Sequence, residues 1–137
     1  MPAAVVDTNV WISAVLEGKT AAKIVELLTD KTFQLIISDK LFEELIFTVR
    51  RAKLNTALND FDREVFISLI KANARFIKPS LKLNICRDSE DDKLLECAVE
   101  VKADFVVTGD SDLLTLNPFR GIEIIKPAEF LKRLNNK

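Results

Sequence analysis

Histidine and tyrosine are both absent from this chain of 137 residues. Without histidine, the sequence excludes Ser–His–Asp and Cys–His catalysis, His-ligated zinc sites and a histidine general base. Any hydrolytic chemistry must therefore depend on carboxylates, lysine or bound metal ions. Glycine and proline are also scarce, with 3 and 4 residues.

Secretion and membrane signals are also missing from the sequence. The two cysteines, Cys86 and Cys97, give no disulfide framework, and Cys97 lies in an apolar helical run that predicts a core position. The first six residues lack a basic segment, Asp7 interrupts the apolar run, and no stretch approaches the roughly 20 apolar residues of a membrane span. We expect a cytoplasmic protein with a single domain over residues 1–137.

Short apolar runs alternate with amphipathic segments along the whole chain. This alternation is typical of a parallel sheet that is covered by helices on both faces. The pattern predicts a three-layer α/β/α domain with a central, mostly parallel sheet of about five strands. The predicted strands are 3–6, 33–37, 75–78, 104–108 and 122–125. The predicted helices are 8–16, 21–28, 39–51, 60–74 and 89–102, with a closing helix from Pro127 and a loop after Gly109.

Carboxylates follow two of the predicted strands. Asp7 ends the first strand, and Asp110 and Asp112 follow the strand at 104–108, so both strands bring acids to the same sheet edge. Glu44 lies in the helix after the second strand, and Asp91 begins a later helix. Carboxylates that converge on one edge repel one another, and a divalent ion offsets that cost. Oxygen ligands alone favour Mg²⁺ or Mn²⁺ over zinc.

Each acid taken alone has a simpler structural interpretation. Asp7 can cap the following helix, Asp110 and Asp112 can stabilise a turn, and Glu44 can be solvated. The acids at 88, 91 and 92 can complement a helix dipole, and Ser89 with Asp92 resembles a capping box. The coincidence of acids at all four places favours a common site over these separate roles.

Helical geometry distinguishes the acids at the start of the helix at 89–102. At 100° per residue, Asp91 falls on the face of Leu94, Leu95 and Ala98, whereas Asp92 is turned about 100° away. We therefore expect Asp91 to reach the site and Asp92 to be an exposed cap. Asp88 stays open as an additional acid of the site.

Four motifs, in this order, resemble the acidic elements of PIN domains. They are VVDTNV at 5–10, ISDKLFEEL at 37–45, DDKLLECA at 91–98 and VTGDSDLL at 107–114. The stretches CRDSEDDK at 86–93 and KPAEFL at 126–131 are similar to the VapC-like toxins of toxin–antitoxin pairs. The resemblance covers nearly the whole chain and implies a metal-dependent endoribonuclease, either acting on single-stranded or on structured RNA.

The resemblance also implies roles for individual residues. Asp7, Glu44, Asp91 and Asp110 would be catalytic, and Asp7, Asp91, Asp110 and Asp112 would bind Mg²⁺ or Mn²⁺. Asn9 and Thr108 would orient these groups. It further implies an antitoxin partner and a homodimer, and whether one or two ions bind is left open.

Other functions and surfaces are weighed against this one. A non-catalytic RNA-binding PIN module is one alternative, and a phospho-aspartate phosphatase or receiver is another, although Asn9 stands where such a phosphatase has an acid. Basic residues at Arg50, Arg51 and Lys53, with Arg87, are expected either to contact RNA or, for the first two, to complement a helix end. Core packing is favoured over an interface for Trp11 and the Phe42/Phe47 pair.

Overall fold

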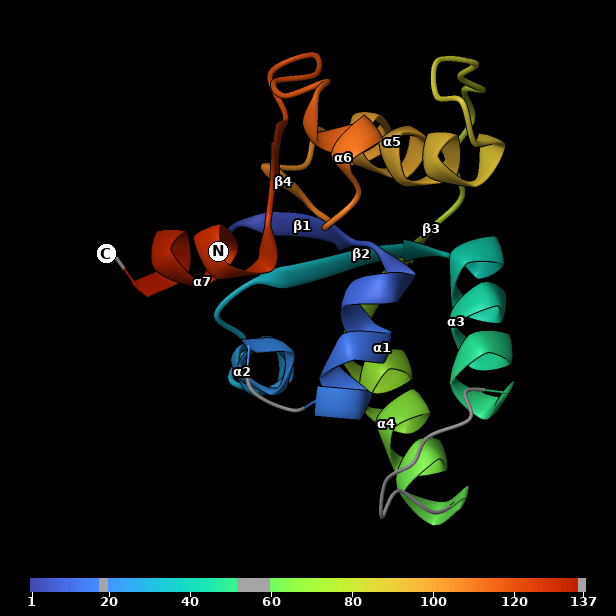
Figure 1. Ribbon diagram of the computed structural model, residues 1–137, viewed down its shortest axis with the longest axis vertical. Helices are drawn as coiled ribbons and strands as arrows, with labels where there is room; N and C mark the ends of the chain where they lie inside the picture. Colours follow the sequence, from blue (N-terminus) through green and yellow to red (C-terminus); the bar gives the residue numbers. More distant parts are fainter. Residues whose placement is uncertain (18–19, 52–59, 136–137) are drawn as a thin grey trace.

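A parallel sheet forms the middle layer of the computed structural model, which describes residues 1–17, 20–51 and 60–135 (Figure 1). Its strand order is β3-β2-β1-β4-β5, and every neighbouring pair is parallel. The strands are β1 (Ala3–Val6), β2 (Gln34–Ser38), β3 (Ala74–Ile77), β4 (Phe105–Val107) and β5 (Glu123–Ile125). The predicted three-layer α/β/α class is thereby confirmed.

Helices cover both faces of this sheet (Figure 1). One face carries α5 (Ser89–Val101) and α6 (Ser111–Leu114). The other carries α1 (Thr8–Glu17), α2 (Thr20–Thr29), α3 (Asp39–Arg51), α4 (Asp60–Asn73) and α7 (Pro127–Asn135). Within the described residues no helix is both long and apolar enough to cross a membrane.

The short helix α6 replaces the loop that the sequence predicted after Gly109. Asp110 caps it, because its side chain accepts a hydrogen bond from the backbone N–H of Asp112 at 2.9 Å. The buried side chain of Leu113 anchors the helix in the core. A helix of four residues is too short to show an apolar period, which explains why the sequence did not reveal it.

Two apolar cores, one on each side of the sheet, hold the layers together. The larger contains Trp11, whose ring packs edge-on against Phe66 at 5.9 Å between centroids, so the expected core position of Trp11 is confirmed. The smaller contains Cys97, again as expected. One expectation about the phenylalanines is wrong, because Phe47 is 59% exposed.

Strand register places the site. Val6 of β1 lies opposite Val107 of β4, and the Asp7 N–H donates to the Val107 carbonyl at 2.9 Å. Asp7 and Thr108 therefore emerge side by side at the carboxyl edge of the central two strands. Both strands are continuous apolar runs, as strands of a parallel sheet covered on both faces require.

Candidate active site

Asp7 is the acid at the centre of the carboxyl edge, and its carboxylate is held by two hydrogen bonds. Oδ1 accepts from the Asn9 N–H at 3.1 Å, and Oδ2 accepts from the Thr108 hydroxyl at 2.8 Å. The residue is only 8% exposed. Asp7 therefore caps α1, and it also lines the cavity described below.

Thr108 connects the acids of two strands. Its fully buried hydroxyl donates to Asp7 and accepts from the Asp110 N–H at 3.0 Å. One hydroxyl thus sets the spacing between Asp7 and the loop that carries Asp110. Asp7 and Asp110 thus lie at the same edge of the sheet, as the order of strands and acids in the sequence predicted.

A small cavity of about 160 Å³ opens beside Asp7. Its walls come from the start of α1, the second turn of α3 and the start of α5. No lysine or arginine lines it. The lining residues are Asp7, Thr8, Asn9, Leu41, Glu44, Asp88, Glu90, Asp91 and Leu94. Five carboxylates from separate stretches of the chain therefore share one concave site.

The pKa of two of these acids is raised, first by burial and then by neighbouring carboxylates. Burial, a hydrogen bond with Asp110 and the charges of Asp110, Asp88 and Asp7 raise the pKa of Asp91 to about 7. Burial, followed by the neighbouring Glu90, raises the pKa of Glu44. The site therefore favours groups or ions that bring positive charge.

Glu90 is a site residue that the sequence did not indicate. Lys93 donates to both of its carboxylate oxygens at 3.0 and 2.9 Å, and this contact lowers the pKa of Glu90. The Lys93 charge also acts on Glu44 in the direction that lowers its pKa. A Glu–Lys pair three residues apart is common on solvated helix faces, so its spacing alone does not signal a site.

Asp92 is not an exposed cap, which corrects the prediction. It is 3% exposed and accepts from the N–H groups of Ile85 and Cys86 at 3.1 and 2.9 Å. The cap of α5 is Asp88, which accepts from the Glu90 N–H at 3.0 Å. Helical geometry considered only the apolar face, whereas the segment at 78–88 packs along α5 and buries Asp92.

Asp112 is placed apart from the cavity. Its side chain is exposed and is not among the lining residues, while its backbone N–H donates to Asp110. Asp91, in contrast, contacts Asp110 directly. Asp110 does not line the cavity either, but it lies within hydrogen-bond reach of Asp91. The structure therefore brings Asp7, Glu44 and Asp91 together in the cavity, places Asp110 next to Asp91, and leaves Asp112 apart.

The donor set of the cavity fits a hard divalent cation in its chemistry. All of the charged groups that line it are carboxylates, and burial together with the neighbouring acids raises the pKa of Asp91. As the side chains lie, no three acidic or thiol groups in residues 1–17, 20–51 and 60–135 are close enough to hold one ion together. Side-chain rotations toward an ion would be needed to complete its coordination.

Cysteine chemistry does not contribute here. Burial and the neighbouring Asp92 raise the pKa of the Cys86 thiol to about 12, and burial raises that of Cys97 to about 11. Neither thiol forms the thiolate that a nucleophile needs near neutral pH.

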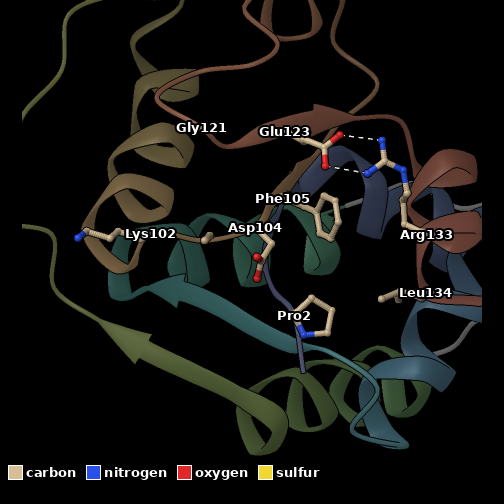
Figure 2. A pocket seen from close by; sticks show the side chains of 9 residues that line it. Pro2, Lys102, Asp104, Phe105, Gly121, Glu123, Arg133 and Leu134 are labelled. Atoms are coloured by element: carbon tan, nitrogen blue, oxygen red, sulfur yellow. Dashed lines mark hydrogen bonds and ion pairs between the residues drawn. The ribbon is translucent and has the colours of Figure 1, made fainter. Parts of the chain in front are cut away.

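A larger cavity, of about 420 Å³, lies at the opposite, amino-terminal edge of the sheet (Figure 2). Arg133 and Glu123 form two hydrogen bonds of 2.7 Å across one side of it, and the Asp104 carboxylate accepts from the Ala3 N–H at 2.9 Å. Its charged groups are thus largely engaged with one another. It lacks the convergent acids of the cavity beside Asp7.

The basic residues at the end of α3 are engaged within the protein. Arg50 forms a two-fold ion pair with Glu64 at 2.9 and 2.7 Å, and Arg51 lies over the Phe47 ring at 4.8 Å. The charge of Arg50 is therefore matched by a neighbouring helix, which weakens its expected role in RNA contact. Lys53 lies outside the described residues.

Comparison with known proteins identifies the family. The sequence model of the PIN domain matches residues 3–112, a range that includes Asp7, Glu44, Asp91 and Asp110. A relative in Methanocaldococcus jannaschii, uncharacterized protein MJ1680, is 32% identical over 114 residues, which are 82% of this chain and 73% of that protein. The chain therefore belongs to the PIN domain family.

Two solved structures share the fold. VapBC2 from Rickettsia felis, bound to a DNA fragment from its promoter, has a TM-score of 0.61 at 16% identity and matches 90% of this chain and 98% of that one. PAE2754 from Pyrobaculum aerophilum has a TM-score of 0.65 at 13% identity and matches 100% of this chain and 91% of that one. At these identities the likeness concerns the fold alone.

Proposed function

We propose that the protein is an endoribonuclease that uses Mg²⁺ or Mn²⁺ to hydrolyse phosphodiester bonds in single-stranded or structured RNA. One observation carries the proposal: Asp7, Glu44 and Asp91, from three separate stretches of the chain, line one cavity at the carboxyl edge of the sheet, and Asp110 lies next to Asp91. Membership of the PIN domain family supports a nuclease.

The chain's own residues divide the work. Asp7, Asp91 and Asp110 would hold the ion, with Asp112 as an auxiliary ligand, and Glu44 would hold a second ion or orient water. A divalent ion in such a site activates water and offsets the charge of the phosphate and of the departing oxygen. Thr108 fixes the orientation of Asp7 through its 2.8 Å hydrogen bond. No histidine is needed as a base.

The wider biological role is part of the same proposal. The fold is similar to that of VapBC2, and the motifs of this chain resemble the VapC-like toxins of toxin–antitoxin pairs. We propose a cytoplasmic toxin of one PIN domain, residues 1–137, that forms a homodimer and is held by an antitoxin. Growth arrest on expression, relieved by Asp7→Asn, would support the toxin role, and unaffected growth with an active enzyme would contradict it.

A pair of variants with the same change of charge tests the nuclease. Asp7→Asn should lower the rate of cleavage of a labelled RNA in Mn²⁺ by about 100-fold or more, because it removes a charge aimed at the reacting centre. Asp30→Asn is the control, since Asp30 is exposed just after α2. Cleavage by Asp7→Asn at the wild-type rate would overturn the mechanism.

The same proteins distinguish the enzyme from a non-catalytic module. Mn²⁺ should raise the melting temperature of the wild type and of Asp30→Asn but not of Asp7→Asn, because a ligand of the folded state stabilises it. A wild-type protein that binds RNA, does not cleave it and gains no stability from Mn²⁺ would favour the non-catalytic RNA-binding module instead.

A further inference from the structure

A second depression lies on the same sheet edge as the acidic cavity and has the opposite charge character. It has a volume of about 400 Å³ and lies over the ends of β2 and β3. Four lysines line it: Lys40 of α3, Lys78 and Lys82 of the segment after β3, and Lys93 of α5. We call this depression the lysine groove.

Strand register explains why lysines so distant in sequence meet there. Ser38 of β2 lies opposite Ile77 of β3, so Lys78 emerges beside the first turn of α3. Ser38 caps α3 by accepting from the Leu41 N–H at 3.2 Å, and both Ser38 and Lys40 line the groove. The positive end of the α3 dipole therefore adds to the charge of the lysines.

The far wall of the groove is held in place by α5. The connection from β3 to α5 rises from the sheet to the layer of α5 (Figure 1). Glu100 accepts from both the N–H and the hydroxyl of Ser80 at 2.7 and 2.9 Å, and Glu96 accepts from the Leu83 N–H at 2.9 Å. Lys82 lies between these two anchor points, so the wall that carries it is fixed by hydrogen bonds.

The charges of the groove are unevenly matched. Two acids also line it, Asp39 and Glu96, and Glu96 is already engaged by the Leu83 N–H. Lys93 is paired with Glu90, at the boundary with the acidic cavity. Lys78 and Lys82 are exposed, and the positive charge lies mainly with them and Lys40.

Groove and cavity are direct neighbours. Lys40 and Leu41 are consecutive in α3, but the first lines the groove and the second lines the cavity. Lys93 and Leu94 divide in the same way on α5. An extended chain whose one phosphate lies at the acids would thus continue over β2 and β3, whose spacing is about 5 Å per strand.

We propose that the lysine groove binds the phosphodiester backbone of the RNA strand on one side of the bond that is cut. This inference rests on the proposed function. It adds the direction in which the bound RNA strand extends from the acidic cavity. Lysine ammonium groups bind phosphates as point charges and without regard to sequence, so the groove positions RNA and does not select bases.

Variants that replace two lysines by uncharged glutamine, with a matched control, test the groove. Lys78→Gln/Lys82→Gln removes two of its charges, and Lys102→Gln/Lys132→Gln removes two exposed charges away from it. Binding of a fluorescein-labelled 12-nucleotide RNA is measured by anisotropy in EDTA over a range of salt. For single strands the slope of log affinity against log salt concentration changes by about 0.7 per phosphate contact. The magnitude of this slope should therefore fall by about 1.4 in the groove variant, which should bind about 25-fold more weakly at 0.1 M salt.

An equal slope for the groove variant and the wild type would overturn the proposal. An equal loss in the control pair would also overturn it, because net charge and not the groove would then be responsible. Circular dichroism and melting of both pairs identify any variant that fails to fold, in which case Lys78→Gln and Lys82→Gln are measured singly, each with an expected slope change of about 0.7.

Cleavage kinetics separate this proposal from the nuclease itself. With Mn²⁺, the groove variant should raise KM for the 12-nucleotide RNA with kcat unchanged, and should cut a dinucleotide, which has a single phosphodiester, at the wild-type rate. Loss of dinucleotide cleavage in the groove variant would contradict a role in binding alone. If the wild type has no nuclease activity but the variants show the expected difference in salt slope, the nuclease proposal is contradicted and the RNA-binding groove is supported.

Discussion

Replacing Thr108 by valine should destabilise the protein through the two hydrogen bonds of one hydroxyl group. The hydroxyl donates to the Asp7 carboxylate at 2.8 Å and accepts from the Asp110 N–H at 3.0 Å, and the residue is fully buried. Valine keeps the shape of threonine and removes both bonds. The Asp110 N–H and one oxygen of Asp7 are then left without this partner.

The magnitude follows from the two bonds. A hydrogen bond to a charged group contributes about 1.5–3 kcal/mol and a neutral one about 0.5–1.5 kcal/mol. Burying a methyl group in place of the hydroxyl returns about 1 kcal/mol. The free energy of unfolding should therefore fall by about 2 kcal/mol, and the melting temperature by about 6–10 °C for a chain of this size.

Urea unfolding in EDTA measures this change without any contribution from bound metal. Thr108→Ser is the matched control, because it keeps the hydroxyl and loses only a methyl group, at a cost of about 1 kcal/mol. The decisive comparison is a double-mutant cycle with Asp7→Ala. Once Asp7 is alanine, Thr108→Val removes only the bond from Asp110 and should cost at least 1 kcal/mol less.

The result that would refute this reasoning is an equal cost of Thr108→Val in both backgrounds. Equal costs would mean that the threonine stabilises the core without holding Asp7. The role given to Thr108 in orienting the acid would then be abandoned, even if the valine variant were less stable than the wild type.

Two further predictions concern other parts of the fold. Asp92→Ala should lower the free energy of unfolding by about 2–4 kcal/mol, because the N–H groups of Ile85 and Cys86 lose a charged acceptor, and a change below 0.5 kcal/mol in urea unfolding would contradict this. Arg133 lowers the pKa of Glu123, so this acid stabilises the fold above its unfolded pKa near 4.5, and the contribution disappears as pH falls through the lower, folded pKa. The difference in unfolding free energy between wild type and Glu123→Gln should therefore shrink from pH 7 to pH 3, and a constant difference would disprove the linkage.

Sequence alone was sufficient for the layers and for most of the site. The apolar runs at β1 and β4 are buried on both faces, so their pattern and their terminal acids were readable without coordinates. Asp7 follows β1 directly, Asp110 follows β4 after Thr108 and Gly109, and parallel strands bring their carboxyl ends to one edge. The meeting of these two acids was therefore a consequence of chain order and strand direction.

Tertiary packing decided the roles of acids that lie on helices. Asp91 and Asp92 are adjacent and chemically identical, yet one faces the acidic cavity and the other holds a crossing segment. Helical geometry could not include the segment at 78–88, because it does not show which distant stretch of the chain packs on which side of the helix. Glu90 was missed for the same reason, since its importance comes from Glu44 on another helix.

The lysine groove shows the same limit most clearly. Lys40, Lys78, Lys82 and Lys93 follow no motif and have no common period, and each alone is an ordinary surface lysine. Only the pairing of β2 with β3 and the hydrogen bonds from α5 bring them to one place. Sequence determined which residues end each strand, through burial and strand period, whereas the three-dimensional packing of segments far apart in the chain determined which charges became neighbours.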